Sequence, residues 1–134
     1  MSFLYFSRIH VYASTINGKY HRPVQTLRAL CDLARPINSF ITALSVTVGG
    51  LCAQGPILAD AVLLAALSAV WINAAGNAFN DLFDVDIDRI NRPQRPLPAG
   101  RITPQTAALF SAFCTLIGIG LGAAVSAQHA LWAA

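Results

Sequence analysis

Six asparagine and aspartate side chains recur at helical spacing in the middle of the chain, and they are Asn73, Asn77, Asn80, Asp81, Asp84 and Asp88. On one α-helix, with about 100° between successive residues, all six fall within an arc of about 100°. Asp86 points away from this arc, which predicts a solvated side chain or one paired with an arginine. The remaining face, with Trp71, Phe79 and Ile87, suits lipid or a neighbouring helix. The spacing therefore predicts a polar stripe along an otherwise apolar helix.

The side chains of this stripe are suited to binding a hard cation. It contains neither histidine nor cysteine, so its ligands are all oxygen atoms. Several carboxylates on one face repel each other unless a cation neutralises them, and oxygen ligands select an ion such as Mg²⁺ or Ca²⁺. Mg²⁺ usually takes one or two carboxylates and completes its coordination with water and substrate phosphate.

The residues after the stripe supply the complementary groups for phosphate, and they are Arg89, Asn91, Arg92, Arg95 and Arg101. Guanidinium groups bind phosphate oxygens through paired, charge-assisted hydrogen bonds. Carboxylates for a metal beside arginines for phosphate indicate a site for a magnesium diphosphate. The alternative interpretation is a solvated acidic helix end, followed by basic residues that only fix the orientation in a membrane.

The composition of the chain decides what kind of element positions these residues. The 134 residues are 55% hydrophobic and only 11% charged, with a mean hydropathy of +0.55. Soluble domains carry about a quarter charged residues, and disorder requires low hydrophobicity. The composition excludes both classes, and the net charge of +3 is too small to argue for a nucleic-acid partner. We therefore expect an integral membrane protein.

Apart from Asp60, the charged residues lie in two segments, 8–35 and 81–101, and the apolar runs between and after these segments are long enough to cross a membrane. The sequence predicts an all-α, polytopic transmembrane helix bundle with spans at about 37–53, 57–79 and 106–125. Both charged segments fall on the same side of the membrane, because two spans separate them. By the positive-inside rule this side is the cytoplasm, which places the N-terminus there, in the cell (inner) membrane.

The segment before the first span and the segment between the second and third spans are expected to lie at the cytoplasmic surface. Residues 24–35 have the spacing of a short amphipathic helix on the membrane surface. Residues 1–23 are expected to form a tail that is either disordered or interfacial. Residues 84–105 are expected to form a cytoplasmic loop, so that residues 24–134 make one membrane domain.

The stripe and its loop resemble the first aspartate motif of the UbiA family of intramembrane prenyltransferases. The resemblance runs without a gap over residues 76–102 and rests on Asn80-Asp81-x-x-Asp84-x-x-x-Asp88 and Asn91-Arg92-Pro93-x-Arg95-Pro96-x-Pro98-x-Gly100. Arg35-Pro36-x-Asn38 is similar to the opening of the family. Residues 76–81 and 87–93 most resemble the branch that adds a geranylgeranyl group to geranylgeranylglyceryl phosphate.

The resemblance implies a helical fold of about nine spans, dependence on Mg²⁺, a polyprenyl diphosphate donor and a lipophilic acceptor, either an aromatic ring or an alcohol. It implies that Asp84 and Asp88 are catalytic. The metal ligands would be Asn80, Asp81, Asp84 and Asp88, and the diphosphate ligands Asn77, Asn91, Arg92 and Arg95. Asn38 and Asn73 would contact substrate.

The chain offers about three of these nine spans and one of the two aspartate motifs of the family. It is therefore expected to be a fragment, or one piece of an assembly in which a second chain supplies the second motif. A catalytically inactive membrane remnant is the main alternative. A soluble isoprenoid synthase, in which residues 80–84 imitate an aspartate-rich motif, is disfavoured by the charge-free runs.

Overall fold

The computed structural model describes residues 23–53 and 59–133, and these residues form helices joined by short connections. The helices are α2 (Pro23–Ala34), α3 (Pro36–Cys52), α4 (Ala59–Phe83), α5 (Val85–Asn91) and α6 (Pro104–Ala133). Residues 1–22 of the expected tail, and residues 54–58 between α3 and α4, lie outside the described residues. The described part of the chain is all-helical, as the sequence predicts.

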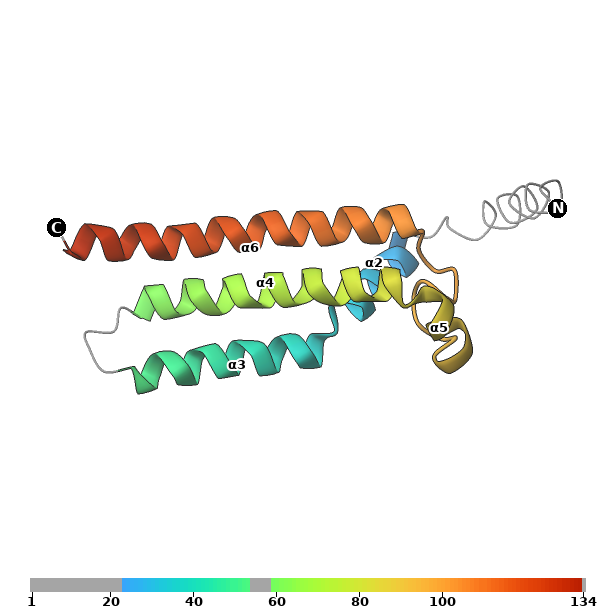
Figure 1. Ribbon diagram of the computed structural model, residues 1–134, viewed down its shortest axis with the longest axis horizontal. Helices are drawn as coiled ribbons and strands as arrows, with labels where there is room; N and C mark the ends of the chain where they lie inside the picture. The colour runs from blue at the N-terminus through green and yellow to red at the C-terminus, as the bar shows by residue number, and fades with distance from the viewer. Residues whose placement is uncertain (1–22, 54–58, 134) are drawn as a thin grey trace.

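Three long helices, α3, α4 and α6, run side by side with α4 in the middle (Figure 1). The short helices α2 and α5 gather at one end of this layer, where α4 ends and α6 begins. α4 packs against each of the other four described helices. The end of α4 is therefore surrounded by segments that are distant in the sequence.

Two of the three long helices are long enough to cross a membrane. α4 and residues 104–127 of α6 are long and apolar enough to cross one, whereas α3 is a shorter apolar helix of 17 residues. At 1.5 Å per residue α3 measures about 25 Å, a little less than a hydrocarbon core of about 30 Å. Large apolar side chains along all three helices face outwards, among them Phe40, Leu44, Leu63, Phe113 and Leu116.

Small residues fill the contact between α4 and α6, as is typical of helices that pack in a membrane. A Cβ atom on Gly118 would lie 2.6 Å from Cδ1 of Ile72, so the glycine allows the two backbones to approach. Ser68 Oγ donates a hydrogen bond of 2.7 Å to the Gly118 carbonyl, and Ser111 Oγ donates one of 3.0 Å to the Ala75 carbonyl. These bonds satisfy hydroxyl groups that lipid could not satisfy.

α2 is attached to the other helices through one face. Ala29 and Leu33 are fully buried and pack in an apolar cluster with Ala78 of α4, Ile102 of the connection and Ala107 of α6. This cluster holds the junction between α2 and α3 against the end of α4. The junction carries Arg35, which is central to the site.

Candidate functional site

The polar stripe does not lie on one helix. The expectation of a single helix through residue 88 is wrong, because α4 ends at Phe83 and a new helix, α5, begins at Val85. The break falls at Asp84, whose backbone (φ −86°, ψ 2°) leaves the α-helical region. Consequently Asp88 approaches Asp81 from a separate element.

The connection from α5 to α6 is folded back over the end of α4. Gly100 has a φ of 65°, which a glycine adopts without strain, and its amide bonds to the Leu97 carbonyl. Arg101 donates to Asp32 of α2 at 2.6 Å, and so ties this connection to α2. Thr103 Oγ1 accepts the Thr106 amide at 3.1 Å and caps the start of α6. These contacts fix the position of Arg95 within the connection.

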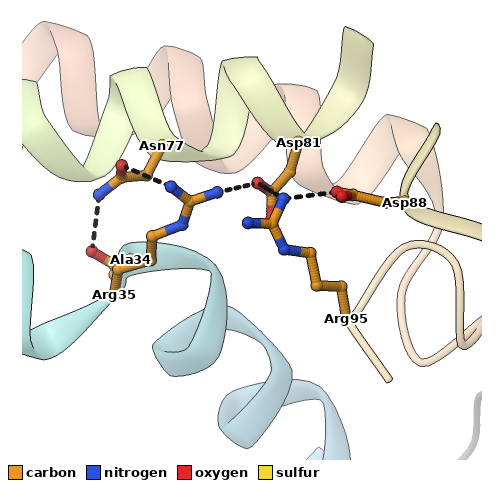
Figure 2. A network of polar contacts seen from close by, with 6 residues as sticks. All are labelled: Ala34, Arg35, Asn77, Asp81, Asp88 and Arg95. Carbon is orange, nitrogen blue, oxygen red and sulfur yellow. Dashed lines mark hydrogen bonds and ion pairs between the residues drawn. The ribbon is translucent and has the colours of Figure 1, made fainter. Parts of the chain in front are cut away.

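The centre of the site is the carboxylate of Asp81, which is 2% exposed (Figure 2). Its Oδ1 accepts hydrogen bonds from Nη2 of Arg35 and, at 3.2 Å, from Nη1 of Arg95. The same Nη1 of Arg95 also donates to Oδ2 of Asp88, which is 5% exposed. Buried charges require such partners, since an unpaired charge away from water is costly.

Arg35 joins this ion network from the junction of α2 and α3. Its backbone is left-handed (φ 52°, ψ 76°), a conformation that costs a non-glycine residue about 1–2 kcal/mol. Arg35 Nη1 donates to Asn77 Oδ1 at 3.5 Å, and the Asn77 amide donates to the Ala34 carbonyl at 3.2 Å. Asn77 therefore holds the carbonyl beside Arg35 as well as its guanidinium group.

Most of the predicted site residues line one pocket of about 430 Å³ next to this network. Its lining residues are Arg35, Asn80, Asp84, Ile87, Asp88, Asn91, Arg92 and Arg95. The pocket thus combines carboxylates and amides with three guanidinium groups. Sequence reasoning did not include Arg35 among the site residues, and the only signal for it was the similarity of Arg35-Pro36-x-Asn38 to the opening of the family.

The other predicted residues lie outside the lining of this pocket. Asp81 and Asn77 are buried in the ion network beside it. Asn73 donates to Ser39 Oγ at 3.3 Å, which links α4 to α3, and Asn38 is exposed on α3. Asp86 pairs with Arg89 at 2.6 Å and is exposed, as expected from its position off the stripe.

The carboxylates already have neutralising charges in the protein. Arg35 and Arg95 provide part of the positive charge that the sequence argument gives to a metal ion. Across the residues that the structure describes, no three histidine, cysteine, aspartate or glutamate side chains form a cluster that could hold a metal alone. The oxygen groups of Asn80, Asp84 and Asp88 still fit a hard cation that takes its other ligands from water and phosphate.

The comparison with known proteins agrees with this combination of helices and site. The sequence profile of the UbiA prenyltransferase family matches residues 42–134. The chain belongs to the UbiA prenyltransferase family, whose members are multi-pass integral membrane proteins that are generally Mg²⁺-dependent. No solved structure matches the chain.

Particular relatives are digeranylgeranylglyceryl phosphate synthases. The digeranylgeranylglyceryl phosphate synthase of Methanopyrus kandleri is 43% identical over 100 residues, which cover 75% of this chain and 36% of that protein. The enzymes of that name from Thermococcus gammatolerans and Methanoculleus marisnigri are 38% and 40% identical, over 75% and 72% of this chain and 37% and 34% of theirs. The chain thus spans about a third of the length of these curated relatives.

Proposed function

We propose that this chain forms the donor-binding part of a Mg²⁺-dependent membrane prenyltransferase. The observation that carries the proposal is the pocket, where Asp84 and Asp88 face Arg92 and Arg95 within one cavity at the end of α4. Cation ligands and phosphate ligands side by side suit a prenyl diphosphate bound with Mg²⁺. The apolar surface of α3, α4 and α6 suits the hydrocarbon part of such a substrate.

In this proposal the residues of the pocket divide the diphosphate group between them. Asn80, Asp84 and Asp88 hold the cation, and Asn91, Arg92 and Arg95 donate hydrogen bonds to phosphate oxygens, together with Arg35. Mg²⁺ supplies Lewis-acid stabilisation of the negative charge on the departing diphosphate. The arginines stabilise the same charge, which lowers the barrier to cleavage of the allylic carbon–oxygen bond.

The reaction replaces one bond to the allylic carbon by another. The bond between this carbon and the diphosphate oxygen breaks, and the electron pair leaves with the diphosphate. The acceptor attacks the carbon, which has gained cationic character, and loses a proton. The names of the relatives favour an alcohol acceptor on a glyceryl phosphate lipid and a geranylgeranyl donor over an aromatic acceptor.

We further propose that the site faces the cytoplasm. In the described residues the site end carries arginines on α2, on α5 and in the connection that follows it. The opposite end of the described bundle carries one charged residue, Asp60 of α4, and no arginine or lysine. Positive charge concentrates on the cytoplasmic side of membrane proteins.

The test is prenyl transfer by the native polypeptide that contains this sequence, in membranes with geranylgeranyl diphosphate and geranylgeranylglyceryl phosphate. Asp84→Asn should lower the rate at least about 100-fold, because one charged cation ligand is lost. Asp86→Asn is the matched control, since Asp86 makes only an exposed pair with Arg89. Equal rates for Asp84→Asn and the unchanged protein would contradict the assignment.

A non-catalytic membrane protein is the competing function. In that case the native polypeptide should show no Mg²⁺-dependent transfer with either an alcohol or an aromatic acceptor. The pocket argues against this alternative, because an ion network that only holds helices together has no need of the further groups of Asn80, Asn91 and Arg92 around a cavity.

A further inference from the structure

Asp81 differs from the other carboxylates of the site in its position. Asp84 and Asp88 line the pocket, whereas Asp81 does not, although both of its arginine partners do. Its carboxylate is buried and bonds through one oxygen to Arg35 and Arg95. Figure 2 shows Asp81 next to both guanidinium groups, and it shows Asp81 and Asn77 on opposite sides of the guanidinium group of Arg35.

The three residues come from separate segments of the chain. Arg35 stands at the junction of α2 and α3, Asp81 lies in the last turn of α4, and Arg95 belongs to the connection after α5. Two guanidinium groups at such close quarters repel each other, and the single carboxylate between them removes that repulsion. Asp81 is the one described side chain that bonds to both arginines.

We infer that Asp81 is a positioning residue, which fixes Arg35 and Arg95 for the diphosphate and does not itself bind the cation. The inference rests on the proposed function, since it concerns the same pocket. It revises the expectation from sequence, which placed Asp81 among the metal ligands. Arg95 also bonds to Asp88, so the positioning extends to one carboxylate that would hold the cation.

The physical reason is preorganisation. Long arginine side chains lose conformational entropy when they bind phosphate, and this cost falls if a carboxylate already holds them in place. Loss of the carboxylate should therefore weaken phosphate binding without changing the affinity for Mg²⁺. A metal ligand would have the opposite signature, with a larger Mg²⁺ requirement.

The experiment measures two equilibrium constants on the native polypeptide in detergent, with inorganic diphosphate and Mg²⁺ as probes. One is the Kd of diphosphate at saturating Mg²⁺, and the other is the Mg²⁺ concentration that gives half-maximal diphosphate binding. For Asp81→Asn we expect the Kd of diphosphate to rise about tenfold, because Arg35 and Arg95 lose the charge-assisted hydrogen bonds to Asp81 that hold them in place. The Mg²⁺ midpoint should stay unchanged. For Asp84→Asn we expect the Mg²⁺ midpoint to rise by about tenfold. Asp86→Asn should change neither constant.

A double-mutant cycle tests whether Asp81 acts through Arg35. The paired variant Asp81→Asn with Arg35→Gln removes one charge of each sign. If Asp81 acts through the arginines, the paired variant should bind diphosphate less weakly than the product of the two single effects. Effects that simply multiply would overturn the inference.

The outcomes separate this inference from the proposed function. Asp81→Asn with an unchanged Kd, or with a Mg²⁺ midpoint raised as in Asp84→Asn, would overturn the positioning role alone. An unsubstituted protein that binds no diphosphate at any Mg²⁺ concentration would overturn the proposed function, and the inference with it.

Discussion

Arg95 bonds to two carboxylates that belong to different helices, whereas Arg35, the other arginine of the ion network, pairs with one. Its side chain is 16% exposed, while the carboxylates of Asp81 and Asp88 are almost completely enclosed. A buried ion network of this kind offers little stability over apolar packing, but the loss of one member is costly. The position of this network at the pocket therefore agrees better with a binding role than with a purely structural one.

Replacement of Arg95 tests the contribution of this ion network to stability. Arg95→Gln should lower the free energy of unfolding by about 3 kcal/mol, because Asp88 loses its partner while it remains buried. Arg89→Gln removes an exposed ion pair with Asp86 and should cost less than about 1 kcal/mol. Unfolding in detergent with increasing dodecyl sulfate measures both values, and similar losses for the two variants would contradict the buried network.

The elements show which part of the fold the sequence determines locally. The limits of α3 and α4 lie close to those of the apolar runs, since a membrane helix must be apolar over its length and charge marks its ends. The separate helix that begins at Val85, after the break at Asp84, was not predicted, because helical spacing continues across the break and the distant contacts of Asp88 decide the geometry. The bond from Arg35 to Asp81 joins residues 46 apart, and no pattern of spacing indicates such a contact.

The sequence predicted which residues share the pocket better than it predicted the role of each residue. Asn80, Asp84, Asp88, Asn91, Arg92 and Arg95 were all expected in one site and share one pocket. Each of them follows from the motif itself, which spans only 16 residues and folds back on the end of one helix. Asp81 lies in the ion network beside the pocket because it bonds to two arginines from outside α4. Helical spacing contains no information on these partners, so the position of Asp81 could not be predicted.

The contact between α4 and α6 can be tested with glycines of the same helix. Gly118→Ala should destabilise the protein by about 1–3 kcal/mol, since the new methyl group would meet the side chain of Ile72 at 2.6 Å and its backbone nitrogen at 3.2 Å. Gly120→Ala faces open space and should be neutral or stabilising by up to about 1 kcal/mol. The same unfolding measurement compares them, and an equal effect of both substitutions would refute the close contact.

At the scale of the whole molecule, the described helices present large apolar side chains on their outer surfaces and small ones at their contacts. This is the arrangement of a membrane protein, and it agrees with membership of the UbiA family. A soluble isoprenoid synthase would bury these side chains instead. The chain spans about a third of its curated relatives, so its exposed apolar faces are suited to lipid or to further helices.

The proposed orientation can be tested with cysteines that the chain already contains. Cys31 is exposed on α2 at the site end, and Cys52 is exposed at the other end of α3. After replacement of Cys114 by alanine, a variant that retains only Cys31 should react with a membrane-impermeant maleimide in inverted vesicles. A variant that retains only Cys52 should react in intact cells. The reverse pattern would place the site on the outer side.

The most direct test of the account is an experimental structure of the native polypeptide with Mn²⁺ and a geranylgeranyl thiodiphosphate, which resists cleavage. We predict an anomalous signal from the metal beside Asp84 and Asp88, and the diphosphate oxygens within hydrogen-bond distance of Arg92 and Arg95. A diphosphate bound away from these residues, or a pocket that stays empty at saturating ligand, would contradict it.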